Sequence, residues 1–150
     1  MIRVQREDFD PGREIDELAR GDASVGGVAS FIGVVRAGSG PDAITAMTLE
    51  HYPGMTERAL EEIEAEARRR WPLSGCLIVH RFGRLLPGER IVLVVTAAAH
   101  RQAAFAACEF LVDWLKTKAP FWKLETTKDG ERWVEAKDSD DDAARRWVAE

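Results

Sequence analysis

The chain has 150 residues, of which 45% are hydrophobic and 31% charged, and its formal net charge is -5. This composition is typical of a globular protein with its own core, and the negative charge disfavours a nucleic-acid-binding surface. No apolar run approaches the ~20 residues of a membrane-spanning helix, and the first ten residues lack the apolar segment of a signal peptide. The sequence therefore predicts one cytoplasmic domain over residues 1–150, with no membrane contact.

Apolar periodicity, prolines and glycines divide the chain into alternating helices and strands. In chain order we expect a helix over 10–20, strands over 26–36 and 44–51, a helix from the Pro53-Gly54 turn to residue 71, strands over 75–82 and 90–98, a helix from 100 to the Pro120 stop, strands over 121–127 and 131–136 joined by an Asp129-Gly130 hairpin, and a helix over 143–148 after an acidic run. The continuous apolar run 91–95 predicts a central strand.

Several residue groups suggest functional motifs but lack the required spacing. The glycines at positions 26, 27 and 33 do not match a phosphate-binding loop, which favours close packing or a bulge. Cys76 and Cys108 lack zinc-ligand spacing and lie on apolar faces, which favours buried thiols over a persulfide carrier. The glutamates of the 55–71 helix precede three arginines, which favours a solvated face over a metal site. His80 lies on a predicted core strand, where a structural histidine is the default interpretation.

The stretch from His100 to Glu125 gathers positive charge in an otherwise acidic chain. The cationic side chains are Arg101, Lys116, Lys118 and Lys123, with His100 at the start of the helix. Such a cluster indicates a site for a small anion, although lysines near a helix C-terminus also stabilise the helix dipole without any ligand. The apolar face of the helix comprises Ala104, Cys108, Leu111 and Leu115, widened by Phe105 and Val112.

Two geometric expectations follow. Arg101 and Lys116 lie fifteen residues apart on nearly one helical stripe, which separates them by roughly 22 Å, so a small ligand that needs both would require two subunits. Lys123 and Glu125 alternate to the same side of their strand, where the carboxylate could hold the ammonium.

Arg36 lies at the end of a strand, before a flexible loop over residues 37–42. Its guanidinium could bind a phosphate, or it could be a solvated surface group.

Together these residues resemble the family of large, catalytic subunits of molybdopterin synthase. The resemblance covers nearly the whole chain and is carried by Phe31-Ile32-Gly33-Val34-Val35-Arg36, Leu49-Glu50-His51-Tyr52-Pro53-Gly54-Met55, His80-Arg81, Gly83-Arg84, Pro87-Gly88-Glu89, His100-Arg101, Leu115-Lys116, Ala119-Pro120-Phe121-Trp122-Lys123, and Trp133-Val134-Glu135-Ala136.

The resemblance implies an α+β fold, with a hammerhead-like α/β lobe and an additional antiparallel β lobe, in a dimer at the centre of a heterotetramer. It implies sulfur transfer to cyclic pyranopterin monophosphate, which forms the dithiolene of molybdopterin. The sulfur donor would be the C-terminal thiocarboxylate of a small ubiquitin-like partner, with no metal or cofactor. The implied catalytic residues are Lys116 and Lys123, and the implied substrate-binding residues are Val34, Val35, Arg36, His100, Arg101, Lys116, Lys123, Leu124 and Glu125. The alternative is a non-enzymatic module that binds a phosphorylated metabolite or an acidic peptide tail.

Overall fold

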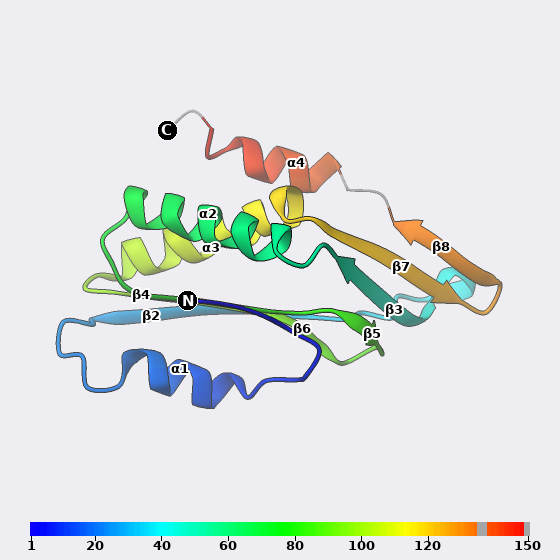
Figure 1. Cartoon of the computed structure of the whole chain (residues 1–150), viewed down its shortest axis with the longest axis horizontal. Helices are drawn as coiled ribbons and strands as arrows, with labels where there is room; N and C mark the ends of the chain where they lie inside the picture. The colour runs from blue at the N-terminus through cyan, green and yellow to red at the C-terminus, as the bar shows by residue number, and fades with distance from the viewer. Residues whose placement is uncertain (135–137, 149–150) are drawn as a thin grey trace.

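The computed structural model describes residues 1–134 and 138–148, which form two β-sheets and four α-helices (Figure 1). The first sheet contains β1 (Ile2–Gln5), β2 (Gly27–Val34), β4 (Leu73–Arg81) and β6 (Arg90–Ala98). The second contains β3 (Ile44–His51), β5 (Gly83–Leu85), β7 (Phe121–Thr127) and β8 (Gly130–Val134). The helices are α1 (Pro11–Ala19), α2 (Met55–Arg70), α3 (Arg101–Lys118) and α4 (Asp138–Arg145), with a 3-10 turn η1 (Gly40–Asp42). This mixture confirms the predicted α+β class.

The first sheet has the strand order β1-β4-β6-β2, so β6 occupies the interior position that its apolar run predicts. It pairs antiparallel with both β4 and β2, and Leu93, Val94 and Val95 are fully buried. Helix α1 covers one face of this sheet, α2 and α3 cover the other, and α4 lies over them (Figure 1). The helix that carries the predicted anion site is therefore fixed between the sheet and α4.

The second sheet has the order β5-β3-β7-β8 and extends beyond one end of the first (Figure 1). Strand β7 pairs with β3 from Ile44 opposite Thr127 to His51 opposite Phe121. Met47, Leu49 and Leu85 are buried in a cluster with Val35. Strand β7 thus lies inside this sheet, with β3 on one side and β8 on the other.

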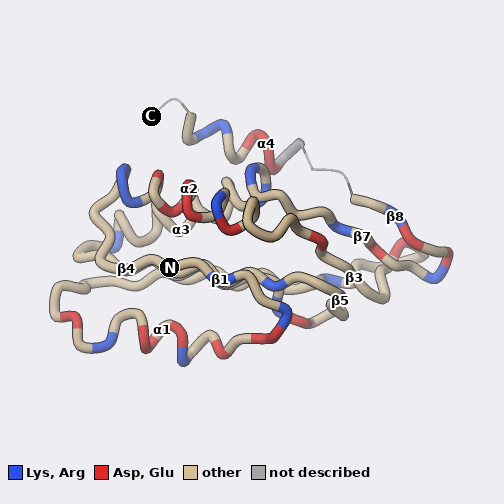
Figure 2. Tube along the Cα trace, in the orientation of Figure 1, with Lys and Arg blue, Asp and Glu red and all other residues tan. Residues whose placement is uncertain are grey.

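The glutamates of α2 form ion pairs along a charged surface, as the sequence predicts. Acidic and basic positions are interleaved along α1 and α2 (Figure 2). Glu64 pairs with Arg68 and with the N-terminal amine, and Glu66 pairs with Arg69 and Arg70. Residues 1–134 and 138–148 contain no group of three or more His, Cys, Asp or Glu side chains that could hold a metal ion.

Two of the strand glycines are required by close packing. A Cβ atom on Gly26 would lie 2.0 Å from the carbonyl oxygen of Ala99. A Cβ atom on Gly33 would lie 2.7 Å from Cγ1 of Val92, next to the register shift between Gly33 and Val34. Both contacts are too short for any larger residue, which confirms packing and a bulge as the reasons for these glycines.

Some elements differ from the prediction. The sequence analysis missed β1, because this strand has only four half-buried residues and lies at the sheet edge, and it missed the three-residue β5. The last helix begins at Asp138, so the acidic run lies inside α4 rather than before it. Aspartates are tolerated there because negative charge stabilises the first turn of a helix. The predicted strand over 131–136 ends at Val134, and its last two positions lie outside the described residues.

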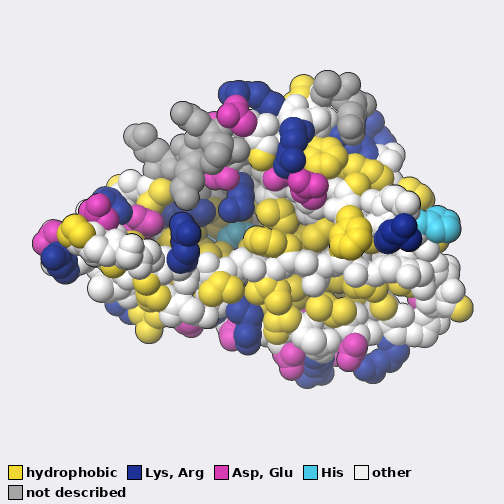
Figure 3. Space-filling model, turned by 180° about the vertical axis from the view of Figure 1, so that it is seen from behind, with side chains coloured by type: hydrophobic (Ala, Val, Ile, Leu, Met, Phe, Trp, Pro, Cys, Tyr) yellow, Lys and Arg dark blue, Asp and Glu magenta, His cyan; other side chains and the backbone are white. Residues whose placement is uncertain are grey.

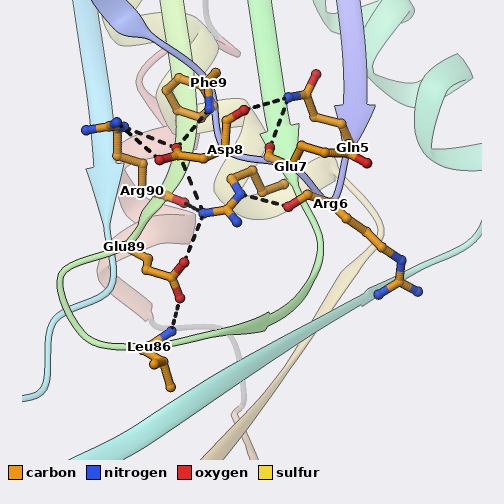
Figure 4. A network of polar contacts seen from close by, with 9 residues as sticks. Gln5, Arg6, Glu7, Asp8, Phe9, Leu86, Glu89 and Arg90 are labelled. Carbon is orange, nitrogen blue, oxygen red and sulfur yellow. Dashed lines mark hydrogen bonds and ion pairs between the residues drawn. The ribbon is translucent and has the colours of Figure 1, made fainter.

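A buried arginine connects three segments at the junction of the two sheets. Arg81 is 7% exposed, and it donates hydrogen bonds from Nε to the Arg6 carbonyl and from Nη1 to the Arg90 carbonyl, both at 3.0 Å. Its Nη1 also lies 3.6 Å from Oε1 of Glu89 and 4.0 Å from Oδ1 of Asp8 (Figure 4). Two carbonyls and two carboxylates thus compensate the burial of its charge.

Candidate functional site

Helix α3 presents the cationic side chains at its two ends. His100 is the N-cap, with extended backbone angles and no capping hydrogen bond from its side chain, and Arg101 is the first helical residue; both are exposed. Lys116, also exposed, lies in the last turn. Since α3 is unbroken from residue 101 to 118, the separation of roughly 22 Å between Arg101 and Lys116 holds. The two groups do not meet within one chain.

The second lysine enters from β7, directly after the end of α3. Ala119 caps the helix and Pro120 precedes the strand, so Lys116 and Lys123 are carried by one continuous segment. Lys123 lies opposite Leu49, which is 1% exposed, and opposite Val134 on β8. Lys123 is itself half-buried, so it faces the interior side of the second sheet rather than open solvent. Lys118, in contrast, makes a cation–π contact, with its Nζ 4.6 Å from the centre of the Trp114 ring.

The acidic groups of α3 are paired with residues that directly follow α4. Asp113 accepts hydrogen bonds from Nη2 of Arg146 at 2.8 Å and from Nε1 of Trp147 at 2.7 Å. Glu109 lies 3.0 Å from the same guanidinium. Arg146 therefore offsets Glu109 and Asp113, the two acidic side chains of α3, which leaves the basic character of the helix ends dominant.

Arg36 follows the buried Val35, the first residue after β2, and is exposed. The side chain of Val35 is 2% exposed, its amide donates to the Glu89 carbonyl at 2.9 Å, and its carbonyl accepts from the Gly88 amide at 2.8 Å. Val34, in contrast, is 47% exposed. Of these three predicted substrate-binding residues, Val34 and Arg36 present their side chains to solvent, whereas Val35 anchors the segment in the core.

Glu125 and Leu124 complete the predicted set. Glu125 accepts hydrogen bonds at Oε1 from Nε and Nη2 of Arg132, at 3.2 and 3.1 Å, across the β7–β8 hairpin. Sequence reasoning missed Arg132. The predicted Asp129-Gly130 turn would have placed it opposite Thr127, but the chain turns at Lys128 and Asp129, with Gly130 opposite Thr127, and this register places Arg132 opposite Glu125. Leu124 points to the opposite face of β7 from Lys123 and Glu125, because side chains alternate along a strand.

Aromatic rings gather at the start of β7. The imidazole of His80 stacks on Phe121 with centroids 3.7 Å apart and an interplanar angle of 15°. The ring of His51 lies 4.4 Å from Phe82 and 6.1 Å from Phe121. Burial, with a smaller contribution from the positive charge of Lys123, lowers the pKa of His80 to about 4. His80 is therefore the buried, neutral histidine that the core strand predicts.

Both cysteines are buried, as predicted. Burial raises the pKa of the Cys76 thiol to about 12 and that of Cys108 to about 11. A thiol that stays protonated is a poor nucleophile, which argues against a persulfide carrier.

An exposed apolar face lies between the two ends of α3. Figure 3 shows hydrophobic side chains gathered across the middle of this side of the molecule, with histidine and basic side chains toward both ends. Phe105 is 65% exposed, so the prediction that it widens the buried face of α3 is wrong. It borders a groove of about 350 Å³ that is also lined by Phe31, Cys108, Glu109 and Val112. Such an apolar patch commonly marks an interaction surface.

No helix within the described part of the chain is long and apolar enough to span a membrane.

Comparisons with known proteins agree with this architecture. The family model described as MoaE protein matches residues 4–118. The molybdopterin synthase catalytic subunit of Pseudomonas aeruginosa is 56% identical over 146 residues, and that of Escherichia coli is 52% identical over 146; each alignment covers 97% of both chains.

Solved structures are similar over nearly the full length. The molybdopterin biosynthesis MoaE protein from Burkholderia ambifaria has a TM-score of 0.84 at 56% identity, covering 100% of this chain and 99% of that chain. Molybdopterin synthase from Staphylococcus aureus has a TM-score of 0.82 at 28% identity, covering 89% and 96%. The family model matches most of the chain, and relatives more than half identical to it align over nearly its full length. The chain therefore belongs to the MoaE protein family.

Proposed function

We propose that this chain is the catalytic subunit of a molybdopterin synthase and acts in the cytoplasm. Its substrate is cyclic pyranopterin monophosphate, and its sulfur donor is the C-terminal thiocarboxylate of a small ubiquitin-like partner. The observation that carries the proposal is the placement of Lys116 and Lys123 on either side of Pro120, on a chain that shares more than half of its residues with a relative named for this activity.

In the proposed reaction, the thiocarboxylate sulfur attacks a carbon of the pterin side chain, a carbon–sulfur bond forms, and the carbon–oxygen bond at that position breaks, with the oxygen leaving with the electron pair. The step occurs twice, once for each sulfur of the dithiolene, with a fresh thiocarboxylate each time. Water then cleaves the bond between that sulfur and the acyl carbon, so the sulfur stays on the pterin and the partner leaves as a carboxylate. Lys116 and Lys123 stabilise the negative charge that develops at the acyl oxygen and at the oxygens of the precursor. Arg36, His100 and Arg101 hold the phosphate, and no metal or cofactor takes part.

The proposed active unit is a pair of chains, since Arg101 and Lys116 cannot reach one small ligand within one copy. In a two-fold interface that brings Arg101 of one copy to Lys116 of the other, the symmetry axis passes α3 halfway between them, at Cys108 and Glu109. Both residues line the groove of about 350 Å³. Phe105 and Val112 are also equidistant from this point, so the exposed ring of one copy meets the groove of the other.

Reconstitution tests the reaction directly. The protein is mixed with a thiocarboxylated small subunit and cyclic pyranopterin monophosphate, and molybdopterin is followed by fluorescence after oxidation. We expect product with the unaltered chain and none with Lys116→Ala or Lys123→Ala, while both variants still bind the small subunit. Lys118→Ala, which removes a neighbouring lysine that packs on Trp114, is the matched control and should retain turnover. A stable complex without product would instead indicate the non-enzymatic anion-binding module.

A further inference from the structure

The two histidines beside β7 have assignable tautomers. Nδ1 of His80 lies 2.8 Å from the carbonyl oxygen of Arg81. A carbonyl only accepts, so Nδ1 carries the proton, and the Nε2 atom of the neutral ring keeps its lone pair. The hydrogen bonds of His51 can be assigned in the same way. The hydroxyl of Thr56 has one proton, which it donates to the Tyr52 carbonyl at 2.8 Å. Nδ1 of His51, 3.0 Å from that hydroxyl oxygen, must therefore donate to it.

His80, the buried histidine of the two, packs on the strand that carries Lys123. His80 lies at the end of β4, on the same side of the sheet as Cys76 and Ile78, and its ring stacks flat on Phe121, the first residue of β7. Phe121 and Lys123 share one face of β7, since they are two residues apart. The positive charge of Lys123 also contributes to the lowered pKa of His80. A buried ring with an unprotonated nitrogen thus packs on the strand that carries a proposed catalytic amine, against the residue two positions before that amine.

We propose that His80 is a positioning residue for Lys123, whose ring fixes the start of β7 and whose Nε2 atom accepts a hydrogen bond from the ammonium. The inference rests on the proposed function of Lys123. An acceptor without charge suits this role, because it orients the ammonium and leaves its positive charge available for the developing anion. A carboxylate in the same place would neutralise that charge.

Three substitutions separate hydrogen bonding from packing. His80→Phe keeps an aromatic ring on Phe121 but removes both nitrogens. His80→Asn keeps a donor near the Nδ1 position, and His80→Gln places a polar amide atom near the Nε2 position. We expect kcat to fall about ten- to a hundredfold in His80→Phe and His80→Asn, the cost of losing a hydrogen bond to a charged group, with partial recovery in His80→Gln. KM for the small subunit should stay within about twofold in all three.

The opposite ranking would overturn the proposal. If His80 served packing alone, His80→Phe would be the most active variant and His80→Gln would gain nothing over His80→Asn. Absence of turnover in the unaltered protein would instead reject the proposed function, so the two failures can be told apart.

A measurement on the folded, unaltered protein covers the case in which these variants do not fold. Two-bond ¹H–¹⁵N spectra report the tautomer of each histidine and the hydrogen bonding of its unprotonated nitrogen. We expect His80 as the Nδ1-protonated form, with an Nε2 resonance that moves in Lys123→Met and stays in Lys118→Met. An Nε2 resonance that is unchanged by Lys123→Met excludes the hydrogen bond and with it the positioning role.

Discussion

Glu125 on β7 is held by Arg132 on β8, through hydrogen bonds of 3.2 and 3.1 Å to one carboxylate oxygen. Arg132 is half-exposed, and it also lies 3.7 Å from Asp42 in the turn that precedes β3. The carboxylate beside Lys123 is therefore oriented by the hairpin.

The first prediction concerns this pair. A double-mutant cycle with Glu125→Gln and Arg132→Gln should give a coupling energy of about 0.5 kcal/mol in the free energy of unfolding, because the pair is partly solvated. If Glu125 acts on Lys123 only when Arg132 orients it, the losses in turnover will not add. The double variant should be about as active as Glu125→Gln alone. Fully additive losses would show that the two residues act independently.

The second prediction uses the two ends of α3. Arg101→Ala and Lys116→Ala should each be inactive, but after unfolding and refolding together they should recover about a quarter of the normal activity. Half of the randomly formed pairs combine one copy of each, and each such pair contains one intact site. Mixing Lys116→Ala with Lys123→Ala is the control, since both groups come from the same copy and no site is restored. Failure of the first mixture to recover activity would place both residues in a single-chain site.

The third prediction concerns Phe105. In the proposed interface Phe105→Glu would place a charge in the groove of the other copy, so the protein should behave as a monomer in analytical ultracentrifugation. The monomer should keep its circular dichroism spectrum because the ring is exposed within one chain. Leu86→Glu, at a 45%-exposed residue in the turn after β5, is the matched control and should leave the assembly intact. An unchanged sedimentation coefficient for Phe105→Glu would rule out this face as the interface.

The fourth prediction is a pH dependence of stability. The pKa of His80 is about 4 in the folded protein, compared with the ordinary value of 6.5 expected in the unfolded chain. Between these two pH values the unfolded chain therefore binds more protons. Stability therefore rises with pH across this window, and acidification from pH 7 to pH 5 should cost roughly 2 kcal/mol through this one group. Urea unfolding of the unaltered chain and of His80→Phe at both pH values isolates the contribution. An equal loss in both proteins would assign the acid sensitivity to other groups.

The fifth prediction concerns the thiols. With pKa values raised to about 12 and 11 by burial, Cys76 and Cys108 should resist iodoacetamide at pH 8 in the folded protein and react fully in urea. Mass spectrometry of the intact chain measures this. Rapid modification of either cysteine under native conditions would reopen the persulfide alternative.

The elements that could be predicted from the sequence are those whose ends and faces are marked by neighbouring residues. Strands β3, β6 and β7 were predicted with the observed bounds, because prolines, glycines and alternation mark their ends. The α3 helix was predicted from its apolar spacing, and its length alone separated Arg101 from Lys116.

Other features depend on contacts that no local pattern encodes. The edge strand β1 gains its place from parallel pairing with β4 and from packing of Ile2 and Val4 against the core. The exposure of Phe105 contradicts its apolar character and makes sense only on a face that a second copy could cover. The stack of His80 on Phe121 joins residues 41 positions apart, and nothing near either residue predicts it.

The hydrogen bonds around Glu89 connect the position of Arg36 to the far end of the chain. The Glu89 carbonyl accepts from Val35, whose next residue is Arg36, while the Glu89 carboxylate accepts from the Leu86 amide at 2.6 Å and faces Arg81. Asp8 approaches the same guanidinium and pairs with Arg90 at 3.1 Å. Four segments thus share one polar junction, and we expect a substitution at Asp8 to shift Arg36, the arginine proposed to bind phosphate, although Asp8 does not contact it.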